Sequence, residues 1–403
     1  MKHKGYFISI GGGKNQLPLL GAIQSKGAMS ITVDINDKAP GFDLSQIKII
    51  ESSHEYRKVY SSISQIPLTE PIIGVGTRSY GKSCYTAAYL ANKLKLPGTD
   101  PNVIRTFENK KTYLDILRSK GLSIPKSYEW KSKASFNKLL SEIEYPVVLK
   151  PVLGSGKKDI ELFINRDKLK ERIEKKYPEP NQYLLESYIE GSEVTVLGFV
   201  HNQKFQMISF TDKWSTSYAP FLEIAHSAPS LHLDFLAEIR IFIQNIVYHT
   251  GLNNTPFLAE FKITEQGDVF LLECAPEVGG EFLADYLVPA YYNYNYFESM
   301  YLLLTGNKPK PSEEVLTQSS KKVAIIFATP PNESATIENF HPFVAQENET
   351  LLFEENLKEI ETKINIKQGN LCRPKVIGLQ SNNNEPMDKF INQALERLGV
   401  EYK

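Results

Sequence analysis

Short apolar runs alternate with helical patterns over the first hundred residues. Three of these runs predict strands, at residues 5–10, 30–35 and 72–75. Helical spacing of apolar positions follows the first and the last of them, at residues 16–27 and 80–94. Strands that alternate with helices are typical of a doubly wound parallel sheet. Because a Pro/Gly cluster at 97–101 closes this unit, we expect a Rossmann-like α/β domain over residues 1–105.

From about residue 106 the pattern becomes rich in strands. A helix over 110–120 precedes five strand-like runs, at 145–151, 159–164, 182–189, 193–200 and 205–211. A second helix, over 231–250, then leads into two more strands, at 257–264 and 268–275. This order predicts an α+β region of mainly antiparallel sheet. The part from about Lys310, with two strand-like runs and a helix over 386–398, predicts a small α+β lobe.

The composition is that of an ordinary globular protein with several units. The chain has 403 residues, 41% hydrophobic and 23% charged. Its 46 Lys and Arg balance 47 Asp and Glu, so no charge excess indicates a nucleic acid or an acidic membrane surface as partner. No run approaches the roughly 18 apolar residues of a membrane span, and the start is too short for a signal peptide. We therefore expect no membrane partner.

The three cysteines are far apart in the sequence and show no C-x-x-C spacing. They are Cys84, Cys274 and Cys372. Such an odd, scattered set predicts reduced thiols in a cytoplasmic protein rather than disulfides or a zinc site. We expect each of them to act as a small buried hydrophobic residue.

Two glutamates are predicted to face each other across a hairpin. A turn at Gln266 and Gly267 would pair Glu265 with Asp268, and the same register pairs Glu260 with Glu273. Directly opposed like charges destabilise a sheet, so the pair requires a counter-ion. Magnesium, which accepts one or two carboxylates together with phosphate oxygens, is the natural candidate. The alternative is that both side chains splay apart into solvent.

The segment from Glu273 to Gly280, ECAPEVGG, resembles the motif E-x-N-P-R-x-G-G of ATP-grasp enzymes. The chain is similar to the biotin carboxylase and carboxylate–amine ligase group of that superfamily over nearly its whole length. This resemblance implies a pre-ATP-grasp domain over 1–105, a two-lobed ATP-grasp domain over 106–309 with a lid at about 125–190, and a C-terminal α+β lobe over 310–403. In that family the two opposed acids hold magnesium.

The motif departs from the family at two positions. Ala275 replaces an Asn that is a metal ligand, and Glu277 replaces an Arg that steadies the acyl phosphate. Three interpretations remain open. The substrate chemistry differs, or a metal is held by Glu277 or Glu281, or the chain is a catalytically silent relative.

The resemblance also implies a nucleotide site between the two lobes. Lys150, at the end of an apolar strand, is expected to reach the α- and β-phosphates as a point charge, and Lys110 is expected to be the second phosphate lysine. A Gly-rich loop is expected to close over the phosphates, through Gly154, Ser155, Gly156 and Lys157. The adenine edge is expected to meet Glu186, Ser187 and the backbone to Ile189. Glu193 is expected to bind the ribose, with a surface glutamate as the alternative.

The segment 211–230 resembles the loop that approaches the γ-phosphate and the substrate. The resemblance implies a catalytic group, made of Lys213, His226 and Glu277. It also implies a substrate group, made of Glu223, Gly279, Gly280 and Glu281. A structural, hydrogen-bonded histidine is the alternative at His226.

The implied activity is that of an ATP-dependent ligase. It would activate a carboxylate as an acyl phosphate, transfer it to an amine and release ADP and phosphate. The implied cofactors are ATP and Mg²⁺ or Mn²⁺, and the implied partners are small-molecule substrates and a second copy in a homodimer. A bicarbonate-activating carboxylase-like enzyme and an ATP-binding module without catalysis are the alternatives.

Residues 76–83 match the phosphate-loop pattern G-x-x-x-x-G-K-[ST]. No later apolar run ends in an Asp that would supply the magnesium ligand of such a site. We therefore interpret the segment as a strand, turn and helix of the first domain. Because open α/β sheets bind ligands at this position, Arg78, Ser79 and Lys82 are predicted to hold an anionic substrate group. The triple glycine at 11–13 lacks the third glycine of a dinucleotide fingerprint, so no NAD is inferred.

Overall fold

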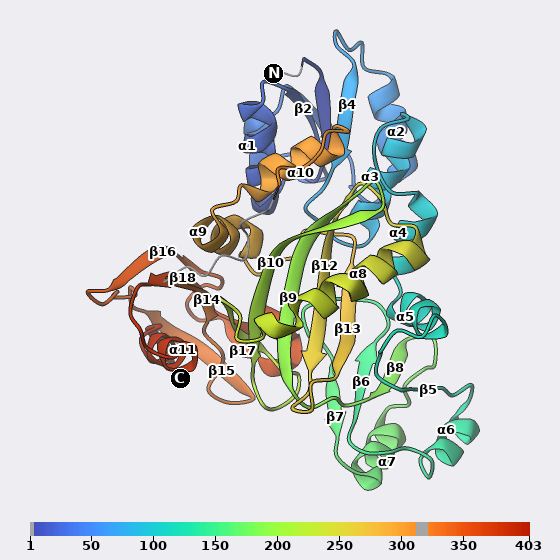
Figure 1. Ribbon diagram of the computed structural model, residues 1–403, viewed down its shortest axis with the longest axis vertical. Helices are drawn as coiled ribbons and strands as arrows, with labels where there is room; N and C mark the ends of the chain where they lie inside the picture. Colours follow the sequence, from blue (N-terminus) through green and yellow to red (C-terminus); the bar gives the residue numbers. More distant parts are fainter. Residues whose placement is uncertain (1–3, 312–320) are drawn as a thin grey trace.

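A four-stranded parallel sheet forms the first domain in the computed structural model, which describes residues 4–311 and 321–403 (Figure 1). Its order is β3-β2-β1-β4, from β1 (Tyr6–Ile10), β2 (Met29–Asp34), β3 (Ile47–Ile50) and β4 (Ile72–Gly76). Its helices are α1 (Leu17–Ser25), α2 (Tyr56–Ser64) and α3 (Lys82–Lys93). The predicted parallel sheet is confirmed. Residues 1–3, on which the expectation about a signal peptide partly rests, lie outside the described ranges.

Helix α3 begins two residues later than predicted. Gly81, directly before it, has φ +60°, which lies outside the right-handed helical region. Two short helices then lead into the next sheet, α4 (Pro101–Phe107) and α5 (Lys110–Ser119). The side chain of Asn109 accepts a hydrogen bond from the Thr112 amide and so caps the N-terminus of α5.

A second, four-stranded sheet has the order β5-β8-β6-β7 and lies at the lower right of Figure 1. Its strands are β5 (Ser127–Tyr128), β6 (Val147–Pro151), β7 (Glu161–Phe163) and β8 (Tyr183–Ser187). Helices α6 (Lys133–Leu139) and α7 (Arg166–Lys175) bury Phe136 and Leu169 against the sheet residues Val147 and Leu149. This unit corresponds to the predicted lid.

The largest sheet has eight antiparallel strands in the order β13-β12-β9-β10-β11-β14-β18-β16. The first five are β9 (Ser192–His201), β10 (Lys204–Ser215), β11 (Glu223–Ala228), β12 (Thr255–Ile263) and β13 (Val269–Ala275). Helix α8 (Leu236–Thr250) buries its apolar side in the core beneath these strands. The predicted antiparallel sheet is confirmed.

The same sheet continues into the C-terminal part of the chain. Its last three strands are β14 (Lys322–Phe327), β16 (Glu349–Asn356) and β18 (Lys375–Ser381). Helix α11 (Met387–Glu396) packs on them, and a small sheet lies beside them, from β15 (Ser334–Phe340), β17 (Lys363–Asn365) and β19 (Val400–Tyr402). The large sheet therefore contains strands from both sides of the domain boundary predicted at residue 310. The division into domains stays a prediction.

The expectation of a loop over 211–230 is wrong. Strands β10 and β11 form a hairpin there, and Lys213 lies opposite His226 in its ladder. The loop was expected from the family resemblance alone, whereas Lys213 and Glu223 of this segment form an ion pair and are buried. The predicted helix over 231–250 likewise begins only at Leu236, after a 3₁₀ turn at Leu233–Phe235.

Two helices link the large sheet to the first domain. They are α9 (Val288–Tyr292) and α10 (Tyr296–Leu304), and Figure 1 shows α10 lying beside α1 and β4. Phe7 of β1, Tyr301 of α10 and Leu197 of β9 belong to one continuous core. Within the described ranges, no helix is long and apolar enough to cross a membrane.

Candidate active site

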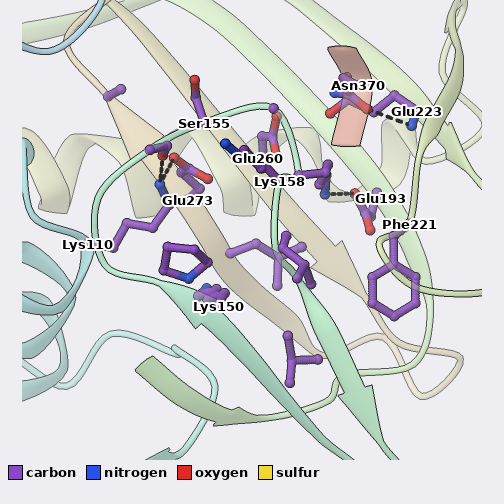
Figure 2. Close-up of a pocket in the computed structure, with 18 of the residues that line it drawn as sticks. Lys110, Lys150, Ser155, Lys158, Glu193, Phe221, Glu223, Glu260, Glu273 and Asn370 are labelled. Atoms are coloured by element: carbon purple, nitrogen blue, oxygen red, sulfur yellow. Dashed lines mark hydrogen bonds and ion pairs between the residues drawn. The ribbon is translucent and has the colours of Figure 1, made fainter. Parts of the chain in front are cut away.

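A cavity of about 820 Å³ opens between the lid sheet, the large sheet and the segment around residue 370 (Figure 2). All ten of the predicted nucleotide residues line it, namely Lys110, Lys150, Gly154, Ser155, Gly156, Lys157, Glu186, Ser187, Ile189 and Glu193. The acidic motif and the substrate group also line it, through Glu223, His226, Glu260, Glu273, Glu277, Gly279, Gly280 and Glu281. The fold therefore brings together segments that are more than a hundred residues apart.

Glu260 and Glu273 are direct cross-strand neighbours, as the sequence predicts. The turn is different, because the Thr264 amide donates to the Asp268 carbonyl at 3.0 Å and no ladder pair joins Glu265 to Asp268. A bulge after Glu260 shifts the register by one residue and restores the predicted pairing at the two glutamates. The predicted pair is thus confirmed and the predicted turn is wrong.

Each of these two glutamates is neutralised by its own lysine. Lys213 Nζ lies 2.7 Å from Glu260 Oε1, and Lys110 Nζ lies 2.9 Å from Glu273 Oε1. Figure 2 shows Lys110 reaching Glu273 across the cavity. Burial opposes ionisation of Glu273, but the nearby Lys110 holds its pKa below the ordinary value. Both carboxylates therefore pair with a lysine and line the same cavity.

Paired carboxylates are suitable ligands for a hard cation. Mg²⁺ binds through one or two carboxylates together with substrate phosphates, so Glu260 and Glu273 suffice for one ion. Ala275, which lines the cavity two residues further on, offers no donor atom. Over the described residues, no group of three or more His, Cys, Asp or Glu side chains is arranged to hold a metal.

The basic side chains at the lid end of the cavity are paired with glutamates. Lys150 Nζ lies 2.5 Å from Glu186 Oε2, and this carboxylate is almost fully buried. Lys110 Nζ also donates to the carbonyl of Gly154 in the Gly-rich loop. The lysines predicted to bind phosphates thus share one cavity wall with the loop predicted to cover them.

Glu193 is held by three lysines rather than exposed to solvent. Its carboxylate lies 3.1 Å from Lys262, 3.5 Å from Lys157 and 3.8 Å from Lys213. Burial alone would raise its pKa, but the three positive charges lower the pKa of Glu193 to about 2. The sequence interpretation missed Lys262, although alternation along β12 places it on the same face as Glu260.

Lys213 lies behind the cavity wall and does not line it. Its side chain is fully buried, 2.6 Å from Glu223 and 2.7 Å from Glu260. Burial opposes the charge, but the glutamates outweigh it and raise the pKa of Lys213. Its predicted catalytic role therefore becomes a positioning role, because it holds two cavity carboxylates and touches no open space.

His226 lines the cavity and is 1% exposed. Neither of its ring nitrogens has a hydrogen-bond partner within the described part of the chain, and Nε2 lies 3.8 Å from Glu223 Oε2. The alternative of a hydrogen-bonded structural histidine does not fit this geometry. A buried imidazole without partners at a cavity wall is suited to contact a ligand.

Arg373 is a cavity residue that sequence reasoning missed. Its guanidinium lies 2.6 Å from Glu281 Oε2 and 3.7 Å from Glu223 Oε2, and it lies over the ring of Phe327. Burial raises the pKa of Glu281, and Arg373 opposes that rise. The C-terminal part of the chain thus supplies the cavity with the guanidinium that the motif lacks at Glu277.

Asn370 is a second missed residue, and it joins the Gly-rich loop to β11. Its backbone amide donates to the Gly156 carbonyl at 2.8 Å, and its side-chain oxygen accepts from the Glu223 amide at 3.2 Å. Gly369 beside it has φ +61°, and a Cβ there would lie 2.2 Å from the Gly156 oxygen. No local sequence pattern signals a contact between such distant segments.

A comparison with protein-family models agrees with this geometry. Residues 143–285 match the model described as an ATP-grasp domain. The chain carries an ATP-grasp domain. The matched part includes the Gly-rich loop, Glu193, the hairpin with Glu260 and Glu273, and Glu281. The predicted resemblance to this superfamily is confirmed.

Two curated relatives match part of the chain. An uncharacterized protein, y4rH of Sinorhizobium fredii, is 24% identical over 212 residues, which are 51% of this chain and 44% of that protein. A carbamoyl-phosphate synthase of Methanobrevibacter smithii is 26% identical over 198 residues, which are 48% of this chain and 52% of that protein. The match thus spans about half the length of each curated relative.

Solved structures share the fold over nearly the whole chain. An L-amino acid ligase from Bacillus licheniformis has a TM-score of 0.76 at 19% identity, and a phosphoribosylglycinamide synthetase from Anaerococcus prevotii has 0.74 at 13%. Both alignments cover 100% of each chain. The biotin carboxylase domain of a Hydrogenobacter thermophilus 2-oxoglutarate carboxylase has 0.71 at 14%, over 98% of this chain and 90% of that one. The predicted multidomain ATP-grasp fold is confirmed.

Arg78 and Ser79 of this ATP-grasp protein lie outside the cavity lining. The Arg78 guanidinium forms a short bidentate ion pair with Asp285 and lies over the ring of Phe297. The Ser79 hydroxyl accepts from the Gln16 side chain at 3.2 Å. Asp285 therefore makes the interaction that we expected of a substrate anion, and the pair joins the first domain to the π-helical turn at Leu283–Leu287.

The glycine, lysine and serine that end the phosphate-loop match, Gly81, Lys82 and Ser83, lie outside the cavity lining. The Ser83 hydroxyl is buried and shares a hydrogen bond with Ser53 at 3.0 Å, so it does not face a ligand. Lys82 is exposed and does not line the cavity. In the triple glycine, the Gly12 amide donates to the Asp34 carboxylate at 2.7 Å and so joins the ends of β1 and β2.

The three cysteines are free and buried, as predicted. Burial raises the pKa of each thiol, so none is a reactive thiolate at neutral pH. No thiol nucleophile is therefore available at the cavity.

Proposed function

We propose that this protein is an ATP-dependent carboxylate–amine ligase that forms an amide or peptide bond and releases ADP and phosphate. The opposed carboxylates Glu260 and Glu273, which share one cavity with the lysines and the Gly-rich loop, carry this proposal. Such a site brings a metal-bound nucleotide next to an acceptor region. Structural neighbours named as an L-amino acid ligase and a phosphoribosylglycinamide synthetase support the same class.

The reaction needs charge neutralisation and alignment rather than a protein nucleophile. A carboxylate oxygen of the substrate attacks the γ-phosphorus of ATP and ADP leaves. The amine then attacks the acyl carbon, phosphate leaves, and the amine loses a proton. Lys110 and Lys150 neutralise phosphate oxygens, and Arg373 is placed to attract the substrate carboxylate. Glu260 and Glu273 would hold Mg²⁺ or Mn²⁺, which supplies positive charge beside the phosphates when bound.

His226 is the proposed acceptor of the proton that the amine loses. Both of its ring nitrogens are unpartnered, and it lies in the cavity wall beside Glu223. The Gly-rich loop, held by Asn370, would exclude water that would otherwise hydrolyse the acyl phosphate. Magnesium, the homodimer and a cytoplasmic location are further predictions of the same proposal.

A second candidate is an enzyme that activates bicarbonate. The missing motif arginine argues against it, but Arg373 restores a guanidinium to the cavity and favours a bound anion. Measuring ADP and phosphate release over a panel of amino acids and amines, with and without bicarbonate, separates the two. Release that needs both a carboxylate and an amine supports the ligase. Release that needs bicarbonate supports the second candidate, and tight ATP binding without release contradicts both and indicates a silent module.

A further inference from the structure

Glu277 differs from every other glutamate that lines the cavity. Six of the seven lining glutamates carry a cationic partner within ion-pair distance, namely Glu186, Glu193, Glu223, Glu260, Glu273 and Glu281. Within the described residues, Glu277 has neither an ion pair nor a hydrogen bond. Glu277 is partly exposed to the cavity, and burial together with the neighbouring Glu273 raises its pKa to about 8. A cationic group of a ligand would offset this cost and stabilise the ionised carboxylate, so a counter-charge for Glu277 is expected to come from a ligand.

The local chain directs Glu277 into the cavity. Glu273, Ala275 and Glu277 line it, whereas Cys274 and Val278 between and after them are buried in the core. Ala275 is small, and it leaves space between the two carboxylates. The side chain is thus held at the cavity surface by the packing of its neighbours.

The missing partner is better explained by an organic cation than by a second metal ion. No group of three metal-ligating side chains is found among the described residues, and Ala275 supplies no donor. Lys110 forms its ion pair with Glu273 and not with Glu277, so the position beside Glu277 is left for the cationic group of a ligand. Buried His226, whose two ring nitrogens make no hydrogen bond within the described residues, lines the same cavity.

We propose that Glu277 binds the amine substrate through its protonated primary amino group. This inference rests on the proposed ligase function and deepens it, because it specifies that the acceptor arrives as an ammonium ion. The ammonium ion gives one proton to solvent before its nitrogen attacks the acyl carbon, and the second proton leaves after the attack. The charge inversion at this position, from the Arg of the related motif to Glu, then sets the preference of the cavity for a cationic acceptor. Glu277 is in this view a specificity-determining residue at the acceptor end.

The test compares charged and uncharged nucleophiles in Glu277→Gln and Glu277→Asp. Primary amines are cationic near neutral pH, whereas hydroxylamine is not. For an amine that the wild-type protein uses, we expect Glu277→Gln to raise the apparent KM by about tenfold or more. The KM for hydroxylamine and the Kd for ATP should remain unchanged, and Glu277→Asp should recover part of the amine affinity. Glu265→Gln, an exposed change on the same hairpin, is the matched control.

Several outcomes would overturn the inference. Equal losses with the amine and with hydroxylamine indicate a general defect, and no loss with either shows that Glu277 binds no ammonium group. A lower Mn²⁺ affinity of the ADP complex in Glu277→Gln assigns the residue to the metal instead. Calorimetry separates this inference from the proposed ligase function. Ethylamine and the amino acids of the panel are each titrated into the complex of the protein with an ATP analogue. Glu277-dependent binding without turnover contradicts the ligase function and retains this inference.

Discussion

Glu260 of β12 lies directly opposite Glu273 of β13, and each of these carboxylates is neutralised by a different lysine. Like charges in this arrangement repel unless cations lie between or beside them. In the structure these cations are the side chains of Lys213, beside Glu260, and Lys110, beside Glu273. The lysines thus balance the charge of both glutamates, and carboxylate oxygens are suitable ligands for a divalent cation.

Replacing either glutamate should remove metal-dependent activity. We expect Glu260→Gln and Glu273→Gln each to lower kcat by about a hundredfold or more, because one of only two carboxylate ligands is lost. The Mn²⁺ affinity of the ADP complex, measured by electron paramagnetic resonance, should fall in parallel. Asp268→Asn, an exposed change near the same turn, is the control. Unchanged Mn²⁺ affinity in both variants would show that the metal is held elsewhere.

Glu193 should make stability depend on pH in the acid range. Its pKa of about 2 lies below the ordinary 4.5, so its ionised form stabilises the folded state above pH 4.5. That contribution, on the order of 3 kcal/mol, is lost as the pH falls from about 4.5 to about 2. In urea titrations, Glu193→Gln should be less stable than wild type at neutral pH and equal to it near pH 2. A constant difference at every pH would mean that the three lysines do not act through its charge.

The parts of the site that were predictable are local in the sequence. Glu260 and Glu273 lie in one hairpin, and the Gly-rich loop directly follows the strand that ends in Lys150. Period-two alternation predicts which face of a strand such residues share, although the turn between the two glutamates differs from the predicted one. The bulge after Glu260 escaped prediction because it compensates for a turn of a different length.

The parts that were missed depend on distant contacts. Arg373 reaches Glu281 from the C-terminal part of the chain, and no spacing rule connects the two. Lys213 was expected in a loop because segment 211–230 resembles a loop of the related family, and only the fold shows that Glu223 and Glu260 neutralise it. Helix α10 was missed for a different reason. It is buried on nearly all sides and lacks the polar face by which amphipathic helices are recognised.

Gly369 should be needed for closure of the Gly-rich loop. An alanine there would place its Cβ 2.2 Å from the Gly156 oxygen and 2.6 Å from the Lys158 nitrogen, so loop and C-terminal segment would separate. We expect Gly369→Ala to weaken ATP binding about tenfold, measured by calorimetry. Gly13→Ala is the matched control, because a Cβ at Gly13 meets nothing within 4 Å and its φ is −64°. Full ATP affinity in Gly369→Ala would show that the loop closes without this contact.

Two lysines distinguish the nucleotide cavity from the phosphate-loop match. Lys150 lines the cavity and Lys82 is exposed outside it. Lys150→Ala should therefore weaken ATP binding by about tenfold or more, since a charge-assisted contact to phosphate is lost. Lys82→Ala should leave the affinity for ATP unchanged. If the two variants exchanged these effects, the nucleotide would bind in the first domain.

Arg78 should contribute to stability rather than to substrate binding. Its side chain is 7% exposed and that of Asp285 is 10% exposed, so removing either partner leaves an uncompensated buried charge. We expect Arg78→Ala to lower the free energy of unfolding by about 3–5 kcal/mol. The double variant Arg78→Leu with Asp285→Leu should recover much of this loss, because no buried charge is left alone. Substrate KM should stay at the wild-type value in the double variant. A large rise in KM in the double variant, with stability recovered, would show that Arg78 binds the substrate.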